Sequence, residues 1–258
     1  MSFIRVLLIL IIFFIVTMFL IIFQFLSVSL NFKPWFIPHY YHKFIIKLIS
    51  LKIIKYGKCT PKKPLLIVSN HISWLDILVI SSSIKVSFVA KKEVKDWPFF
   101  GLLAKLQRTV FIERSMKDLI AQKKNMAKRL IVGDNLLLFP EGTSSDGKKV
   151  LPFKSSLFSL AELKNSDDKI TIQPITIAYT SINGLPAGLS ERPLFAWFGE
   201  MSLVSHILNV LLAGPAGAVI IYHSPKTIGE FNSRKGLSEH CEEVISDGLS
   251  RAISGRLD

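Results

Sequence analysis

A histidine followed five positions later by an aspartate is the pair of side chains best suited to acid–base chemistry in this sequence. His71 comes shortly after the apolar run Leu65–Val68, which has the length and the boundaries of a buried strand. We therefore expect His71 at the carboxyl end of a strand and Asp76 in the first turn of the following helix. From there the carboxylate can fix the imidazole tautomer and stabilise the imidazolium, which makes His71 a candidate general base. A purely structural hydrogen bond between the two side chains is the alternative.

Two further polar segments follow predicted strands. Arg114 ends the segment Phe111–Arg114, and its planar guanidinium suits a phosphate or a carboxylate because it donates two parallel hydrogen bonds. A surface ion pair with Glu113 is the alternative. The segment Phe139–Thr143 ends another apolar run with a turn that offers backbone N–H groups, a carboxylate and a hydroxyl. Open α/β sheets place ligands at the carboxyl ends of their strands, so both segments are expected near His71.

In this order and spacing, the segments resemble the glycerolipid acyltransferase family, whose members carry His, four residues, Asp and, later, Phe-Pro-Glu-Gly-Thr. The resemblance runs over roughly residues 60–225 and implies transfer of a fatty acyl group from a thioester to a hydroxyl. Gly142–Gly147 misses the spacing of a G-x-S-x-G nucleophile elbow, so the hydroxyl is expected to attack the thioester directly. The site residues implied by the resemblance are His71 and Asp76 as the catalytic pair, and Arg114, Glu141, Gly142, Thr143 and Lys154 as substrate-binding residues.

The resemblance also implies roles for the binding residues. Arg114 would bind the phosphate of a glycerol acceptor, while Glu141 and Thr143 would hold its glycerol portion. Gly142 would let the backbone approach the acceptor closely. The segment Gln173–Ile177 resembles a fourth family block and would shape the acyl pocket. The implied co-substrate is a thioester of acyl carrier protein or coenzyme A, and neither a cofactor nor a metal is expected.

The identity of the acceptor stays open at the level of sequence. Where many lysophosphatidate acyltransferases have an arginine after Glu-Gly-Thr, this chain has Ser144, which removes a cationic group that could bind a phosphate monoester. The passages Leu151–Phe158, Arg192–Leu203 and Ser233–Glu242 also look like the lyso-ornithine lipid acyltransferase branch, whose acceptor is zwitterionic. Lysophosphatidate is the leading acceptor, and lyso-ornithine lipid is the alternative. A third hypothesis is a catalytically inactive, membrane-tethered binding protein, although His71 and the other motif residues are intact.

Composition indicates a protein that works at a membrane. The chain has 258 residues, half of them hydrophobic, and a formal charge of +13. Val6–Leu30 contains no charged residue, and at about 1.5 Å per residue a helix of this length crosses a hydrocarbon core of roughly 30 Å. A transmembrane or membrane-embedded helix is therefore expected. A cleaved signal peptide is the alternative, but the apolar run is longer than its h-region and only Arg5 precedes it.

A basic segment follows the apolar run. No acidic residue precedes Asp76, and by the positive-inside tendency this lysine-rich side faces the cytoplasm of a bacterial inner membrane. Pro34–Ile54 mixes aromatic and apolar residues with lysines, which predicts an interfacial helix on anionic head groups. A helix packed on the globular domain is the alternative. We expect membrane lipids as partners and no nucleic acid, because the sequence shows no nucleic-acid-binding module. The lysines are Lys33, Lys43, Lys47, Lys52, Lys55, Lys58, Lys62 and Lys63.

Beyond residue 60, short apolar runs alternate with helical patterns, which predicts an α/β fold with a mixed sheet flanked by helices. Strands are expected at Leu65–Ser69, Val86–Ala90, Thr109–Ile112, Leu136–Phe139, Ile170–Tyr179, Leu194–Phe198 and Ala218–His223. Helices are expected at Phe99–Leu106, from Ser115 to Gly133, and at Arg234–Ile253. The expected organisation is a membrane helix at 1–33, a basic amphipathic segment at 34–60 and a catalytic domain at 61–258.

Overall fold

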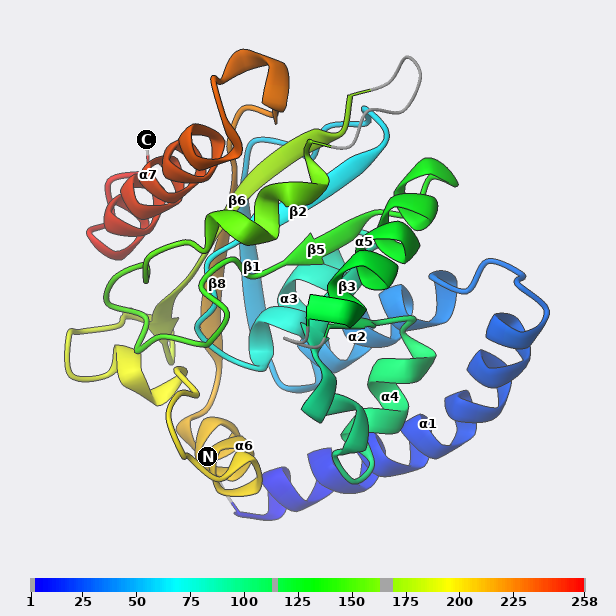
Figure 1. Ribbon diagram of the computed structural model, residues 1–258. Coiled ribbons are helices and arrows are strands. Elements are labelled where there is room, and N and C mark those ends of the chain that lie inside the picture. Colours follow the sequence, from blue (N-terminus) through cyan, green and yellow to red (C-terminus); the bar gives the residue numbers. More distant parts are fainter. Residues whose placement is uncertain (1–2, 113–115, 163–168, 258) are drawn as a thin grey trace.

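A mixed β-sheet forms the centre of the molecule, with helices on both faces (Figure 1). The computed structural model describes residues 3–112, 116–162 and 169–257, without the side chains of residues 116–121. The strand order is β1-β8-β6-β2-β5-β3-β4, and β7 and β9 each pair with β6. The strands are β1 (Leu51–Tyr56), β2 (Leu65–Ser69), β3 (Ser87–Lys91), β4 (Val110–Ile112), β5 (Leu136–Leu138), β6 (Thr171–Ile182), β7 (Leu185–Pro186), β8 (Ala216–Tyr222) and β9 (Lys226–Thr227).

Seven α-helices and four short 3-10 helices lie in the described part of the chain. The α-helices are α1 (Phe3–Ser29), α2 (Phe36–Leu48), α3 (Leu75–Ser83), α4 (Phe100–Leu106), α5 (Met116–Ile131), α6 (Leu203–Ala213) and α7 (Arg234–Ile253). The 3-10 helices are Lys92–Asp96, Ser155–Leu160, Arg192–Leu194 and Ile228–Glu230. In Figure 1, α7 covers one face of the sheet, while α2 and α3 lie on the other.

Strand β2 lies in the middle of the sheet and is buried on both faces. It runs parallel to β5 on one side and to β6 on the other. Leu66 and Val68 pack with α5 and α7, whereas Leu65 and Ile67 pack with α3 on the opposite face. Burial on both faces explains why β2 is a continuous apolar run rather than an alternating one. The central position also fixes where the chain leaves the sheet, just before His71.

Most of the predicted elements are confirmed. β2 and α7 have the predicted bounds. Most ends of seven further elements lie within one or two residues of the prediction, namely those of β3, β4, β5, β6, β8, α4 and α5. The strand predicted at Leu194–Phe198 is wrong. Phe195 and Ala196 are fully buried, but Arg192–Leu194 is a 3-10 turn. The ring of Phe195 stacks on Tyr179 instead, at 5.4 Å between centroids, so its burial comes from side-chain packing and not from a sheet ladder.

The long helix predicted over Pro34–Ile54 is also wrong at its carboxyl end. α2 ends at Leu48, and Leu51–Tyr56 forms the edge strand β1, which pairs in parallel with β8. Residues expected in an interfacial segment are therefore part of the same sheet as the rest of the domain. The remaining helix packs against α3 through Ile45 and Ile46, while Lys43 and Lys47 point to the exposed side.

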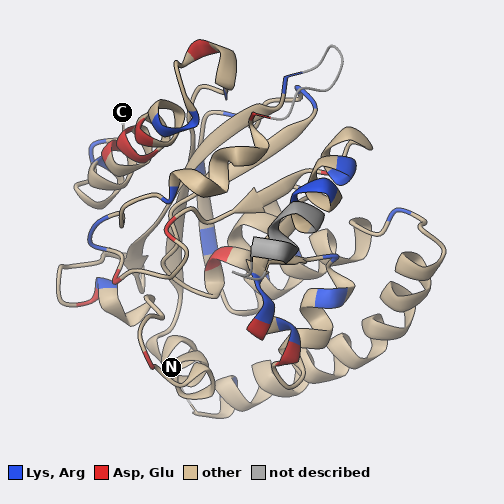
Figure 2. Cartoon of the chain, in the orientation of Figure 1, with Lys and Arg blue, Asp and Glu red and all other residues tan. Residues whose placement is uncertain are grey.

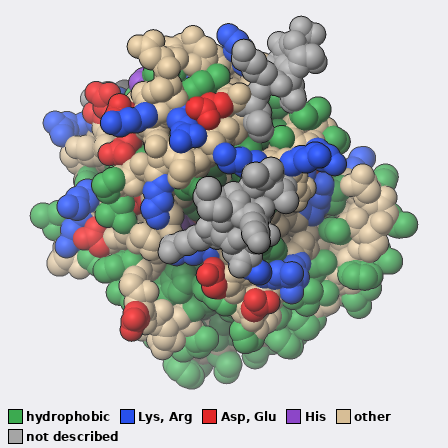
Figure 3. Space-filling model, in the orientation of Figure 1, with side chains coloured by type: hydrophobic (Ala, Val, Ile, Leu, Met, Phe, Trp, Pro, Cys, Tyr) green, Lys and Arg blue, Asp and Glu red, His purple; other side chains and the backbone are tan. Residues whose placement is uncertain are grey.

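Helix α1 lies along the domain and presents a broad apolar face outward. Val6 and Ile9 pack on Leu211 of α6, and Gln24 donates hydrogen bonds to the carbonyls of Pro34 and Leu106 at 2.8 and 2.7 Å. Most of its large apolar side chains remain exposed, and Figure 3 shows hydrophobic side chains gathered along the edge of the molecule where α1 runs. Its length and composition would allow it to cross a membrane. From Val6 onward this helix carries no charged residue, next to a domain with many charged residues (Figure 2).

Candidate active site

His71 and Asp76 form a hydrogen-bonded pair at the carboxyl end of β2. The Nδ1 atom of His71 lies 2.8 Å from Oδ2 of Asp76, which stands in the first turn of α3 and is fully buried. The same Oδ2 accepts hydrogen bonds from the backbone N–H groups of Ile72 and Ser73 at 2.7 and 3.0 Å. Because the carboxylate only accepts, it selects the tautomer with the proton on Nδ1. The unprotonated Nε2 is then free to take a proton from a substrate.

Tyr179 completes the surroundings of Asp76. Its hydroxyl donates to the second carboxylate oxygen, Oδ1, at 2.7 Å, so both oxygens of Asp76 are held. Burial raises the pKa of Tyr179 well above its usual value, and the charge of Asp76 acts in the same direction, which keeps the phenol protonated and donating. Sequence reasoning missed this residue. The available signal was a tyrosine in a strand predicted next to β2, but contact with a specific carboxylate depends on the register between β6 and β2.

Glu141 ties the Phe139–Thr143 turn to the backbone of His71. One carboxylate oxygen accepts from the N–H of His71 at 2.7 Å, and the other accepts from the N–H of Leu151 at 2.9 Å. Burial raises the pKa of Glu141 to about 8, and the two backbone donors act in the opposite direction. Both oxygens are thus used within the chain, and the geometry gives Glu141 a positioning role where the resemblance implied contact with glycerol.

The remaining motif residues meet at the same turn. Phe139 stacks on the imidazole of His71, with centroids 4.0 Å apart and planes 14° from parallel. Gly142 has a φ of +70°, and a Cβ there would meet Nζ of Lys154 at 2.5 Å. A side chain at this position would therefore displace the Lys154 ammonium as well as strain the backbone. Thr143 is exposed beside it, whereas Arg114 lies outside the described residues.

The loop that follows the Phe139–Thr143 turn contacts the backbone of His71 and Ile72. The N–H of Ser145 donates to the carbonyl of His71 at 2.8 Å, and the N–H of Trp197 donates to the carbonyl of Ile72 at 2.9 Å. Ser144 donates its hydroxyl to the carbonyl of Trp197. Position 144 is therefore occupied by a hydroxyl that joins this loop to the segment that carries Trp197.

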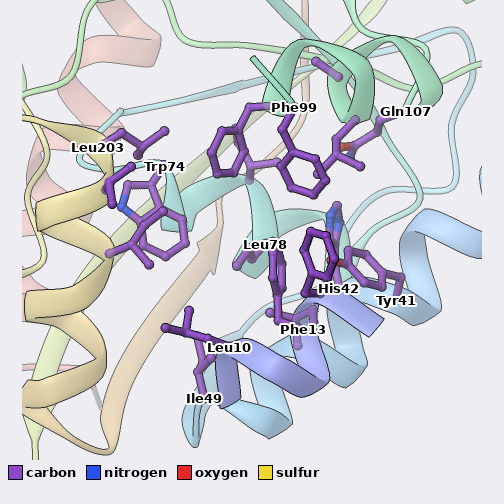
Figure 4. Close-up of a pocket in the computed structure, with 18 of the residues that line it drawn as sticks. Leu10, Phe13, Tyr41, His42, Ile49, Trp74, Leu78, Phe99, Gln107 and Leu203 are labelled. Carbon is purple, nitrogen blue, oxygen red and sulfur yellow. The ribbon is translucent and has the colours of Figure 1, made fainter. Parts of the chain in front are cut away.

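A large apolar cavity of about 750 Å³ lies next to this site (Figure 4). Phe88 lines it and stacks on Phe139, at 6.3 Å between ring centroids, and Phe139 in turn covers His71. Trp74, three residues after His71, forms another part of the wall, and its indole N–H donates to Nδ1 of His206 at 2.9 Å. The cavity wall therefore approaches the His71–Asp76 pair through Phe88 and Trp74, although neither His71 nor Asp76 lines it. Its walls come from α1, α2, α3, α4 and α6, with the side chains labelled in Figure 4 converging on it.

The turn before α4 is shaped to put a phenyl ring into this cavity. Phe99 has a φ of +61°, and the N–H of Phe100 donates to the carbonyl of Pro98 at 2.6 Å across it. Such a conformation costs a bulky residue about 1–3 kcal/mol. Gly101 lets the first turn of α4 lie against the preceding 3-10 helix, because a Cβ there would clash with the carbonyl oxygen of Lys95. The ring of Phe99 meets Phe13 of α1 edge-on at 6.3 Å, which joins the membrane helix to the cavity wall.

The polar groups along the cavity carry no net charge. His42 lies in the wall, and burial lowers its pKa to about 3, so it is neutral at physiological pH. Its Nδ1 atom is hydrogen-bonded to the hydroxyl of Ser81 at 2.8 Å. The predicted pocket-lining segment Gln173–Ile177 is not part of this wall. Gln173 instead accepts from the N–H of Thr60 at 3.0 Å, because β6 lies in the sheet behind the site.

Comparisons with known proteins agree with this geometry. The family model described as "Acyltransferase" matches residues 51–178. A lyso-ornithine lipid O-acyltransferase of Brucella abortus is 40% identical over 243 residues, which is 92% of this chain and 91% of that protein. A 1-acyl-sn-glycerol-3-phosphate acyltransferase of Neisseria gonorrhoeae is 39% identical over 204 residues, 78% of this chain and 77% of that protein.

A solved structure shares the fold. The crystal structure of the 1-acyl-sn-glycerophosphate acyltransferase PlsC from Thermotoga maritima superposes with a TM-score of 0.65 at 19% identity and covers 96% of this chain and 95% of that one. At this sequence identity, the structural similarity supports the fold only. The family assignment rests on the two sequence relatives with 40% and 39% identity. The chain belongs to the glycerolipid acyltransferase superfamily and is a lysolipid acyltransferase.

Proposed function

We propose that this enzyme moves a fatty acyl group from an acyl carrier protein or coenzyme A thioester to the hydroxyl of lyso-ornithine lipid. The observation that carries the acyl-transfer chemistry is the His71–Asp76 pair at 2.8 Å beside an apolar cavity that reaches the membrane helix. The choice of acceptor rests on the relatives, because the match to the Brucella abortus protein spans nine-tenths of both chains.

The pair supports direct transfer without an acyl-enzyme. Nε2 of His71 takes the proton of the acceptor hydroxyl while the oxygen attacks the thioester carbonyl. Asp76 stabilises the imidazolium that forms, and Tyr179 and the backbone N–H groups hold Asp76 in place. When the tetrahedral intermediate collapses, the carbon–sulfur bond breaks and the imidazolium returns the proton to the departing thiolate. The products are an ester and a free thiol, and His71 ends neutral.

The cavity holds the acyl chain of the donor in this proposal. Its walls are almost entirely apolar, and its start beside Phe139 places a thioester carbonyl near His71 while the chain extends toward α4 and α1. Transfer of each methylene from water to such a wall contributes about 0.8 kcal/mol. A cavity of fixed depth therefore selects for chain length.

Enlarging Ala104 in the wall is expected to shorten the preferred chain. Ala104→Leu adds three carbon atoms inside the cavity, so a long chain loses about three methylene contacts, roughly 2 kcal/mol or a factor of about 30. We expect the kcat/KM ratio for stearoyl over lauroyl thioester to fall at least about tenfold. Leu102→Phe, a change at an exposed position of the same helix, is the control. An unchanged ratio in Ala104→Leu would show that the acyl chain lies elsewhere.

Lysophosphatidate is the second candidate acceptor. The Neisseria gonorrhoeae relative is named for that substrate, and Lys154 lies over Gly142, where an ammonium could face a phosphate. A phosphate monoester carries about −1.5 to −2 charge at pH 7 and calls for more than one cation. Ser144 supplies a hydroxyl where an additional cation would be expected, which favours the zwitterionic ornithine acceptor.

Side-by-side assays with both lysolipids test this choice. Wild-type enzyme is expected to acylate lyso-ornithine lipid with the higher kcat/KM. Ser144→Arg is expected to lower kcat/KM for lyso-ornithine lipid, because the guanidinium faces the ornithine ammonium and the hydrogen bond to Trp197 is lost. The same change is expected to leave turnover of lysophosphatidate unchanged or to raise it. Ser190→Arg adds the same charge on another exposed loop and is the control. Wild-type preference for lysophosphatidate would reject the ornithine assignment while leaving acyl transfer intact.

We also place the enzyme at the cytoplasmic face of a bacterial inner membrane. The support is the exposed apolar face of α1, followed by lysines on the turn and on α2 that suit anionic head groups. Because α1 packs along the domain, the open side of the apolar cavity lies close to the acyl layer, while a thioester can arrive from water.

A further inference from the structure

A second cavity, of about 320 Å³, lies at the opposite edge of the sheet from His71. β2, β5 and β3 are parallel, and His71 follows the carboxyl end of β2, whereas Ser87 and Asn135 stand at the amino ends of β3 and β5. The catalytic pair does not line this cavity. Its lining residues are Pro34, Trp35, Pro38, Lys63, Lys85, Val86, Ser87, Gln107, Arg108, Val132, Gly133, Asp134 and Asn135.

Positive charge dominates the cavity. Asp134 is its carboxylate, and two guanidiniums already pair with it, Arg108 at 2.9 Å and Arg129 at 2.9 Å. Arg129 is fixed further by hydrogen bonds to the carbonyl of Arg108 and to the hydroxyl of Ser87. The acidic group is therefore neutralised within the wall.

Two lysines then remain without a carboxylate partner among the lining residues. Lys63 donates to the carbonyl of Gly133 at 3.3 Å, and the ammonium of Lys85 lies 3.9 Å from the centroid of the Trp35 ring. Burial lowers the pKa of Lys63, and the charge of Asp134 acts in the opposite direction without forming an ion pair with this ammonium. Cations gathered around a concave surface repel one another, and a bound anion would relieve that repulsion.

The cavity adjoins the membrane-facing part of the protein. Pro34 and Trp35 come from the connection between α1 and α2, and Pro38 comes from the first turn of α2. Gln24 of α1 holds this connection by donating to the carbonyl of Pro34. Leu30 and Phe32, just before it, are 74% and 67% exposed. Tryptophan and lysine next to exposed apolar residues are typical of the level where lipid head groups meet water.

We propose that this cavity binds the phosphate of an anionic bilayer phospholipid, separately from the acceptor and the donor. Lys63 and Lys85 contact the phosphate, Arg108 closes the site, and the acyl chains of the lipid lie with the apolar residues at the end of α1. A concave site of this size beside Trp35 fits a head group better than the convex surface of a protein partner. The site would hold the α1–α2 connection at the depth of the head groups.

Titration of the full-length protein in neutral detergent, followed by native mass spectrometry, tests the proposal. The probes are short-chain phosphatidylglycerol, short-chain phosphatidylcholine and inorganic phosphate, and no lysolipid is present. We expect phosphatidylglycerol to bind at least about tenfold more tightly than phosphatidylcholine. Equal binding of the two lipids would overturn the proposal. Displacement of phosphatidylglycerol by an equal concentration of inorganic phosphate would overturn the assignment to a lipid.

Variants assign the binding to this cavity. Lys63→Gln/Lys85→Gln is expected to lose the preference for phosphatidylglycerol, while Lys63→Arg/Lys85→Arg keeps it because the charges remain. Lys124→Gln/Lys235→Gln removes the same charge from exposed positions of α5 and α7 and is expected to bind like wild type. Acyl transfer measured in detergent should persist in all three, which shows that they fold. If the glutamine pair at 63 and 85 bound phosphatidylglycerol as the control does, the site would lie elsewhere.

Discussion

Replacing His71 with alanine is expected to lower kcat/KM for acyl transfer by at least about 100-fold, the usual size of the loss when a general base is removed. The structure gives the reason. The imidazole is held by Asp76 and covered by Phe139, and it is partly exposed, so its free nitrogen can reach a substrate hydroxyl. Initial rates with purified full-length enzyme, measured with a thioester donor in excess, provide the measurement.

Two controls make this result specific. The thermal unfolding midpoint of His71→Ala should stay close to that of wild type, because the side chain is not part of the apolar core. His240→Ala removes a histidine from α7, where it packs on Phe231, and should leave the rate little changed. A His71→Ala enzyme that kept more than a tenth of the wild-type rate would rule out the general-base mechanism.

Asp76→Asn is expected to cost on the order of 10⁴-fold in kcat, comparable to the loss in other histidine–aspartate systems. The carboxylate oxygen accepts from Nδ1 of His71 and from two backbone N–H groups. An amide cannot satisfy all of these donors, and if its NH₂ group faces His71 the imidazole must adopt the other tautomer. In that tautomer the imidazole proton is on Nε2, which is the nitrogen that has to accept the proton of the substrate hydroxyl. Single-turnover rates of acyl transfer would report this loss directly.

Tyr179→Phe is expected to have a smaller effect of the same kind as Asp76→Asn. It removes one hydrogen bond to the charged carboxylate, worth about 1.5–3 kcal/mol, so a loss of roughly tenfold or more in kcat is expected with little change in KM for the thioester. Tyr222→Phe, on the neighbouring strand β8, is the matched control. A rise in KM at constant kcat would contradict a role of Tyr179 through Asp76 and would indicate a change in the acyl cavity instead.

Local sequence patterns were sufficient for much of the fold and for the contact between His71 and Asp76. The run Leu65–Val68 is apolar throughout because both of its faces are buried, and this property is visible without a structure. His71 and Asp76 lie at the junction of that strand and α3, so their contact spans five residues and depends on local geometry. The charge-free run of α1 likewise follows from composition.

Elements whose environment depends on distant partners were not predictable in this way. Leu51–Tyr56 has apolar residues that fit a helix or a strand, and it becomes β1 because the edge of β8 is available to pair with it. The reverse holds for Leu194–Phe198, where Phe195 is buried by stacking on Tyr179 rather than by pairing in a sheet. A periodic pattern records which side of a segment is buried, but it does not record what buries it.

The sequence by itself determined the long apolar N-terminal helix, the α/β class and the position of His71 and Asp76, because each depends on residues close together in the chain. Tertiary structure alone decided that Tyr179 holds Asp76, that Glu141 anchors the backbone of His71, and that α1 walls an apolar cavity. The two hydrogen-bonded contacts join residues 103 and 70 positions apart, and the cavity wall joins separate layers of the fold. They depend on strand register and helix packing, which arise from the whole chain condensing around one sheet.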